Sequence, residues 1–81
     1  MAKHPKSPEA RRAEVDAILA QLNPLQIPEN VRDSIASTLN DFARTGQSYS
    51  AKVPIQDTPV AIVYLLSNQA HVTSHIRITK A

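Results

Sequence analysis

The 81-residue chain has no cysteine, no tryptophan and a single glycine. Without cysteine, neither a disulfide nor a zinc–thiolate site can stabilise the fold. One glycine is too few for a glycine-rich loop that binds phosphate, and the Gly-x-Ser-x-Gly turn of many hydrolases is absent. No apolar run approaches the roughly 18 residues that span a bilayer, and no signal peptide is visible. We therefore expect one cytoplasmic domain that needs no cofactor and no metal.

Catalytic groups are also scarce. The seven carboxylates fall on predicted helices or in a loop, away from the histidines of the C-terminal third, so none forms an evident acid–base pair. His71 and His75 are four residues apart, which is about 13 Å in an extended chain, so they cannot ligate one metal ion together. We expect no enzyme activity and no small-molecule substrate.

Two segments have the periodicity of amphipathic helices. The first is expected from Ser7, a capping residue, to about Leu22, where Asn23-Pro24 stops it. The second is expected from Pro28 to about Thr45, with Gly46 as the left-handed residue after its end. Their apolar stripes are Val15, Ile18, Leu19 and Leu22 in the first helix, and Val31, Ile35, Thr38, Leu39 and Phe42 in the second.

Three later segments are predicted strands, over residues 47–55, 59–67 and 70–80. Pro54 makes the first an edge strand or marks its end, and Asn68-Gln69 is the expected turn of the last hairpin. The predicted fold is α+β, with two N-terminal amphipathic helices packed on one face of a three-stranded antiparallel meander (α-α-β-β-β). Residues 1–6 are expected to be a disordered basic tail, and residues 7–81 a single domain.

The middle strand is apolar on both faces, although helices can cover only one face of the sheet. Its uncovered set is either Ala61, Val63 and Leu65, or Val60, Ile62, Tyr64 and Leu66. Each aliphatic side chain left in water forgoes about 1.5–3 kcal/mol of burial. We expect a second copy of the chain or another protein to cover this face. The alternative is that the N-terminal segment or the connector over residues 25–27 folds across it.

The sequence therefore predicts a small non-enzymatic interaction module, either a homodimer or a binder of another protein. Compact chains without catalytic residues are typical of accessory proteins of phages and plasmids. The predicted interface comprises Ala61, Val63, Leu65, His71, Thr73 and His75, and its histidines would make it sensitive to pH.

Nucleic-acid binding is the alternative function. The net charge of +2 permits it, and the predicted contacts lie in the N-terminal arm and on the sheet face. Stacking aromatics are few, and Tyr64 could stack on a base only if its side of the middle strand were uncovered. The residues expected to touch phosphate are Lys3, Lys6, Arg11, Arg12, Lys52 and Arg77.

Overall fold

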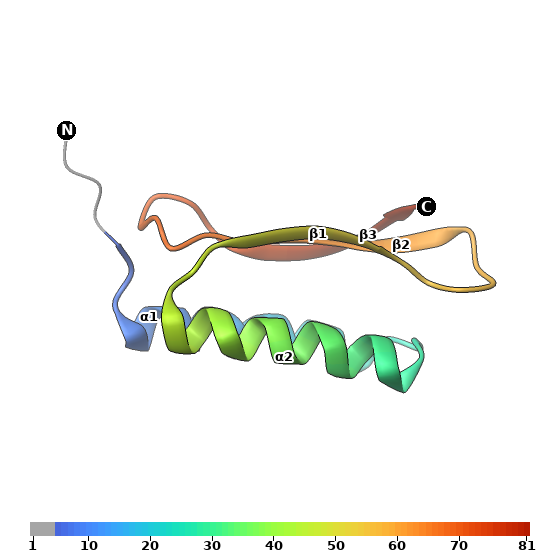
Figure 1. Cartoon of the computed structure of the whole chain (residues 1–81), viewed down its shortest axis with the longest axis horizontal. Coiled ribbons are helices and arrows are strands. Elements are labelled where there is room, and N and C mark those ends of the chain that lie inside the picture. Colours follow the sequence, from blue (N-terminus) through green and yellow to red (C-terminus); the bar gives the residue numbers. More distant parts are fainter. Residues whose placement is uncertain (1–4) are drawn as a thin grey trace.

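A computed structural model describes residues 5–81 and shows two helices followed by a three-stranded antiparallel sheet (Figure 1). The predicted α+β class and the α-α-β-β-β order are confirmed. The strands are ordered β1-β2-β3, so the apolar strand is central. The elements are α1 (Pro8–Leu22), α2 (Glu29–Thr45), β1 (Tyr49–Pro54), β2 (Val60–Leu66) and β3 (His75–Lys80).

The helix ends follow the local sequence signals. Ser7 Oγ accepts a hydrogen bond from the Ala10 amide at 3.1 Å, which satisfies a donor in the first turn of α1. Gly46 ends α2 with a φ of 76°, a left-handed conformation that glycine adopts without a steric penalty. The two helices run antiparallel along the length of the sheet (Figure 1).

Both helices lie on the same side of the sheet, so the molecule has two layers (Figure 1). The core between the layers is aliphatic apart from Phe42 and Tyr64. From β2, Ile62 and Leu66 are fully buried against the helices. The predicted stripes supply most of the helical contribution, with Val15, Ile18, Leu22, Ile35, Leu39 and Phe42 all buried.

The connection between β2 and β3 differs from the predicted two-residue turn. It runs over residues 67–74, and β3 begins only at His75. Buried polar contacts hold this longer loop, because Ser74 Oγ accepts from the Ser67 amide at 3.0 Å. His71 and Thr73 therefore lie in the loop, and the prediction that placed them on the strand face beside His75 is wrong.

The folded part of the chain begins earlier than the predicted boundary at residue 7. Pro5 forms an isolated antiparallel bridge with Gln69, and the Lys6 amide donates to the Asn68 carbonyl at 2.8 Å. The N-terminal segment thus adds backbone contacts to the loop between β2 and β3. Residues 1–4, which include Lys3 and most of the predicted tail, lie outside the described residues.

Candidate interaction surface

The sheet face opposite the helices is built from three rows of paired residues, one residue from each strand. Side chains alternate along each strand, and the register places Val60, Ile62, Tyr64 and Leu66 on the helix side. Their neighbours in β2 therefore point to the other side. We call the following residues the open face: Ser50, Leu65 and His75; Lys52, Val63 and Arg77; Pro54, Ala61 and Thr79.

The structure shows which set of β2 side chains is not covered by the helices. It is Ala61, Val63 and Leu65. The Ala61 methyl is already fully buried between its strand neighbours, whereas Val63 and Leu65 are half-buried. The apolar surface that a partner could still bury is thus supplied chiefly by two side chains.

No segment among residues 5–81 crosses the open face (Figure 1). Pro5 and Lys6 pack instead against the loop after β2. The connector between the helices contributes Leu25 and Ile27 to the core on the helix side. Neither the connector nor residues 5 and 6 of the N-terminal segment lie over this face.

The open face is cationic. Lys52 and Arg77 are exposed and flank Val63 in one row, about 10 Å apart across the sheet. Within residues 5–81, neither forms a salt bridge, and the open face carries no carboxylate. The third basic residue, His75, is exposed at the edge, with Nδ1 3.2 Å from the Thr73 carbonyl oxygen.

Lys6, a predicted phosphate contact, is instead a buried structural residue. Only 9% of its surface is exposed. Its Nζ donates to Glu14 Oε1 at 2.8 Å, to the Ser67 carbonyl at 2.7 Å and to the Val72 carbonyl at 2.6 Å. The ammonium donors are therefore occupied inside the fold, and Lys6 cannot reach a phosphate without breaking these contacts.

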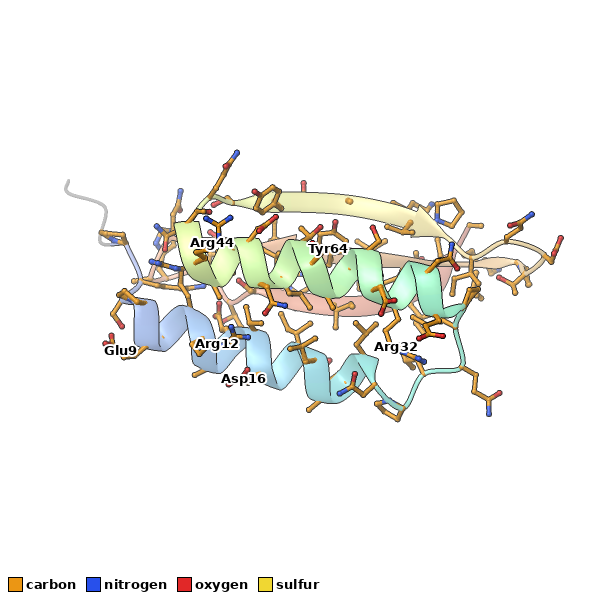
Figure 2. The ribbon with its side chains drawn as sticks, turned by 60° about the horizontal axis from the view of Figure 1, so that its bottom comes forward. Glu9, Arg12, Asp16, Arg32, Arg44 and Tyr64 are labelled. Atoms are coloured by element: carbon orange, nitrogen blue, oxygen red, sulfur yellow. The ribbon has the colours of Figure 1, made fainter. Side chains whose placement is uncertain are left out.

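Arg11 is also buried and serves the fold. Its Nε donates to the Ala43 carbonyl at 3.2 Å in the last turn of α2, and Nη1 donates to the Lys6 carbonyl at 3.1 Å. Arg12, the next residue, lies on the outer surface of α1 beside Asp16, as Figure 2 shows, with a hydrogen bond of 3.2 Å between them. Of the predicted phosphate contacts that the structure describes, only Lys52 and Arg77 share the open face.

Sequence patterns did not identify the partners of Lys6. Glu14 lies off the apolar stripe of α1, and Ser67 and Ser74 are separated by the loop. Burial of Glu14 acts to raise the pKa of its carboxyl group, but hydrogen bonds from Lys6 and Ser74, together with the charge of Lys6, hold that pKa below its usual 4.5. The only sequence feature that could have indicated these partners was the occurrence of Ser67 and Ser74 among apolar residues.

The described residues contain neither a candidate metal site nor a membrane-spanning helix. No group of three or more His, Cys, Asp or Glu side chains is arranged to hold an ion within residues 5–81. In the same part of the chain, no helix combines the length and apolar character needed to cross a bilayer. The open face offers apolar contact and positive charge, which suit binding.

Comparisons with protein-family models, with curated proteins and with solved structures give no match for this chain. Its function has to be inferred from the residues of the open face and their surroundings.

Proposed function

We propose that this chain is a macromolecular interaction module that binds an acidic protein surface through its open face. The observation that carries the proposal is the position of β2, which is apolar on both sides and has helices on only one. Val63 and Leu65 form a short apolar strip with polar side chains around it. An apolar centre with a polar rim is the usual composition of a protein interface.

Charge favours an acidic partner over a second copy stacked face to face. Such a dimer would bring two Lys52 and two Arg77 side chains together without a carboxylate from either open face. Unpaired like charges oppose association, and more strongly once water is excluded. Aspartate or glutamate side chains placed on either side of an apolar contact would pair with both cations.

Nucleic-acid binding is the second candidate, and the Lys52–Arg77 row favours it. The open face has no tyrosine, phenylalanine or tryptophan, because Tyr49 and Tyr64 lie on the helix side, where Figure 2 labels Tyr64 at α2. The exposed His75 imidazole is therefore the aromatic ring that this surface offers for base stacking. With Lys6 and Arg11 occupied in the fold, binding would depend on phosphate contacts from few side chains.

The test compares Val63→Lys with Ser37→Lys, an exposed position on α2 that faces away from the sheet. Each tagged protein is incubated with lysate of its native host at physiological salt, and captured proteins are identified by mass spectrometry. A nuclease-treated sample identifies capture that depends on nucleic acid. Light scattering on the purified proteins reports their oligomeric state.

We expect an acidic protein to be captured by the wild type and by Ser37→Lys, and to be lost with Val63→Lys. Capture that disappears after nuclease treatment would favour the second candidate. A wild-type dimer that Val63→Lys dissociates would show that the face binds a second copy. Identical capture by all three proteins would contradict the use of the open face.

A further inference from the structure

The two edges of the sheet differ in what their backbones offer. The Ile55 amide donates to the Val60 carbonyl at 3.1 Å, and the Ala81 amide donates to the Pro59 carbonyl at 3.0 Å. In an antiparallel ladder, alternate residues bond to the neighbouring strand and the others point their N–H and C=O groups away. With the observed register, the outward groups on β1 belong to Ser50, Lys52 and Pro54, and those on β3 to Ile76, Ile78 and Lys80.

The β1 edge is poorly suited to accept another strand. Proline has no amide hydrogen, so Pro54 interrupts the row of outward donors near one end of β1. Proline and lysine on an edge strand are recognised means of preventing edge-to-edge pairing. This edge therefore carries both of those features, at Pro54 and Lys52.

The β3 edge has no proline, and its lysine, Lys80, is the last residue of the strand. Ile76, Ile78 and Lys80 each have an outward amide and carbonyl, and no loop or side chain among residues 5–81 bonds to them. Ile78 is 48% exposed, and among residues 5–81 it is the large apolar side chain that solvent reaches most. The edge thus presents unpaired backbone groups next to uncovered apolar surface.

A notch lies beside this edge, where the end of α1 and the connector meet β3. Its volume is about 150 Å³, and it is lined by Gln21, Leu25, Ile76, Arg77 and Ile78. Apolar cavities of about that volume can hold a molecule of the size of benzene. An aliphatic side chain projecting from an added strand toward the helix layer would enter it.

On the other side of the sheet, an added strand would meet positive charge. Its alternate side chains would lie beside His75, Arg77 and Thr79, the β3 residues of the open face. Arg77 is exposed and has no ion-pair partner within residues 5–81. Opposite charges on neighbouring strands stabilise a sheet, and like charges destabilise it.

We propose that the β3 edge accepts an extended peptide segment in which acidic and aliphatic residues alternate. The backbone of the segment pairs with Ile76, Ile78 and Lys80, its aliphatic side chains face the notch, and its carboxylates face Arg77. This is strand addition to a sheet edge, with affinity from main-chain bonds and selectivity from alternate side chains. The site uses the backbone of the β3 edge and not Val63 or Leu65, so it shares only Arg77 with the function proposed above.

A second copy of the chain fits the same edge less well. Antiparallel self-pairing centred on Arg77 would place that residue opposite its own copy. Centring on Ile78 instead would place Arg77 opposite Thr79 and Lys80 opposite Ile76. Neither arrangement provides a carboxylate to the cations of β3, whereas the proposed segment provides one at every second position.

The probe is a synthetic ten-residue peptide of alternating glutamate and valine, titrated into the full chain and followed by amide NMR. We expect saturable binding, with shifts concentrated on β3 and the notch. Amide exchange at Ile76, Ile78 and Lys80 should slow at least about tenfold. The Arg77 and Thr79 amides already bond to β2, so their exchange should change less. The same peptide with N-methyl groups on the valines, whose amides would face β3, should not bind, and neither should a lysine–valine version.

Two protein variants, Arg77→Glu and Ile78→Pro, test the residues of the edge, and Lys52→Glu is their control. Arg77→Glu should weaken binding by about fivefold or more, while Lys52→Glu on the far edge should change it by less than about twofold. Ile78→Pro removes an outward amide without removing a ladder bond, and it should abolish binding.

Equal binding of the N-methylated or lysine peptide would overturn the proposal, as would no binding of the glutamate peptide at millimolar concentration. A concentration-dependent dimer joined through β3 would show instead that a second copy occupies the edge. These outcomes are independent of Val63→Lys, which tests the open face.

Discussion

Lys6 Nζ and Glu14 Oε1 are 2.8 Å apart, in an ion pair that joins the N-terminal segment to α1. The side chains are 7% and 22% exposed, so this pair is the most buried of the ion pairs within residues 5–81. The same ammonium donates to the Ser67 and Val72 carbonyls in the loop between β2 and β3. One lysine thereby connects the N-terminal segment and α1 to a loop that lies far along the sequence.

Replacing Lys6 with methionine should destabilise the fold by about 2–4 kcal/mol, because Glu14 and two carbonyls would lose their buried donor. Urea denaturation followed by circular dichroism measures this. Lys52→Met is the matched control, since Lys52 is exposed and forms no hydrogen bond within the described chain. We expect the control to change stability by less than about 0.5 kcal/mol. Equal effects of the two variants would contradict the structural role of Lys6.

The Lys6–Glu14 pair should make stability depend on pH in the acid range. The pKa of Glu14 in the folded state lies below its usual 4.5, because the hydrogen bonds from Lys6 and Ser74 outweigh the effect of burial. A depressed folded-state pKa means that the stabilisation is complete above the unfolded value and is lost as pH falls through the folded value. The difference in unfolding free energy between wild type and Glu14→Gln should therefore shrink below about pH 4.5. Denaturation at a series of pH values tests this, and a difference that grows toward acid pH would show the opposite sign.

Arg11→Met should cost about 2–3 kcal/mol, because the Ala43 and Lys6 carbonyls would lose a charged donor in a buried place. The neighbouring Arg12→Met is the control, since Arg12 contacts only Asp16 and Asn40 at the surface. Surface ion pairs contribute roughly 0–1 kcal/mol. Thermal unfolding compares the two, and a larger loss from Arg12→Met would refute this assignment.

Gly46→Ala should destabilise the protein by about 1–2 kcal/mol or more, because an L-residue is strained at a φ of 76°. An added Cβ would also lie 3.2 Å from Arg11 Nη1, and that guanidinium is held by its carbonyl partners. Gly46→Asn separates the two effects, since asparagine tolerates the left-handed conformation but brings the same Cβ. We expect asparagine to recover only part of the loss in chemical denaturation. Full recovery of stability by Gly46→Asn would mean that backbone strain alone accounts for the loss in Gly46→Ala.

Ile62 and Val63 are adjacent in β2 but point to opposite sides of the sheet. Ile62→Lys should unfold the domain or cost more than about 4 kcal/mol, because it places a charge in the core. Val63→Lys should cost less than about 1.5 kcal/mol, since its side chain reaches solvent on the open face. Urea titration of the two variants gives the comparison. Comparable losses would indicate that the open face is covered within the monomer.

Both helices and the order of the three strands were determined by the sequence alone, because each depends on neighbouring residues, whereas the start of β3 at His75 was not. Ser7 and Gly46 marked helix ends through capping and a left-handed backbone, and the aliphatic stripe of α2 indicated its buried side. The central place of β2 also followed, since consecutive strands tend to pair and the apolar strand is the second of three.

Tertiary structure decided the roles of the polar residues and the register of β2. Periodicity left two alternatives for its uncovered side, because every position of β2 is apolar, and packing against the helices selected Ile62, Tyr64 and Leu66 for the core. Lys6 and Arg11 looked like solvent-exposed cations, yet both are buried, because they donate to carbonyls of Ser67, Val72 and Ala43, which lie far along the chain. Such partners are brought together only by the complete fold, and no local pattern contains them.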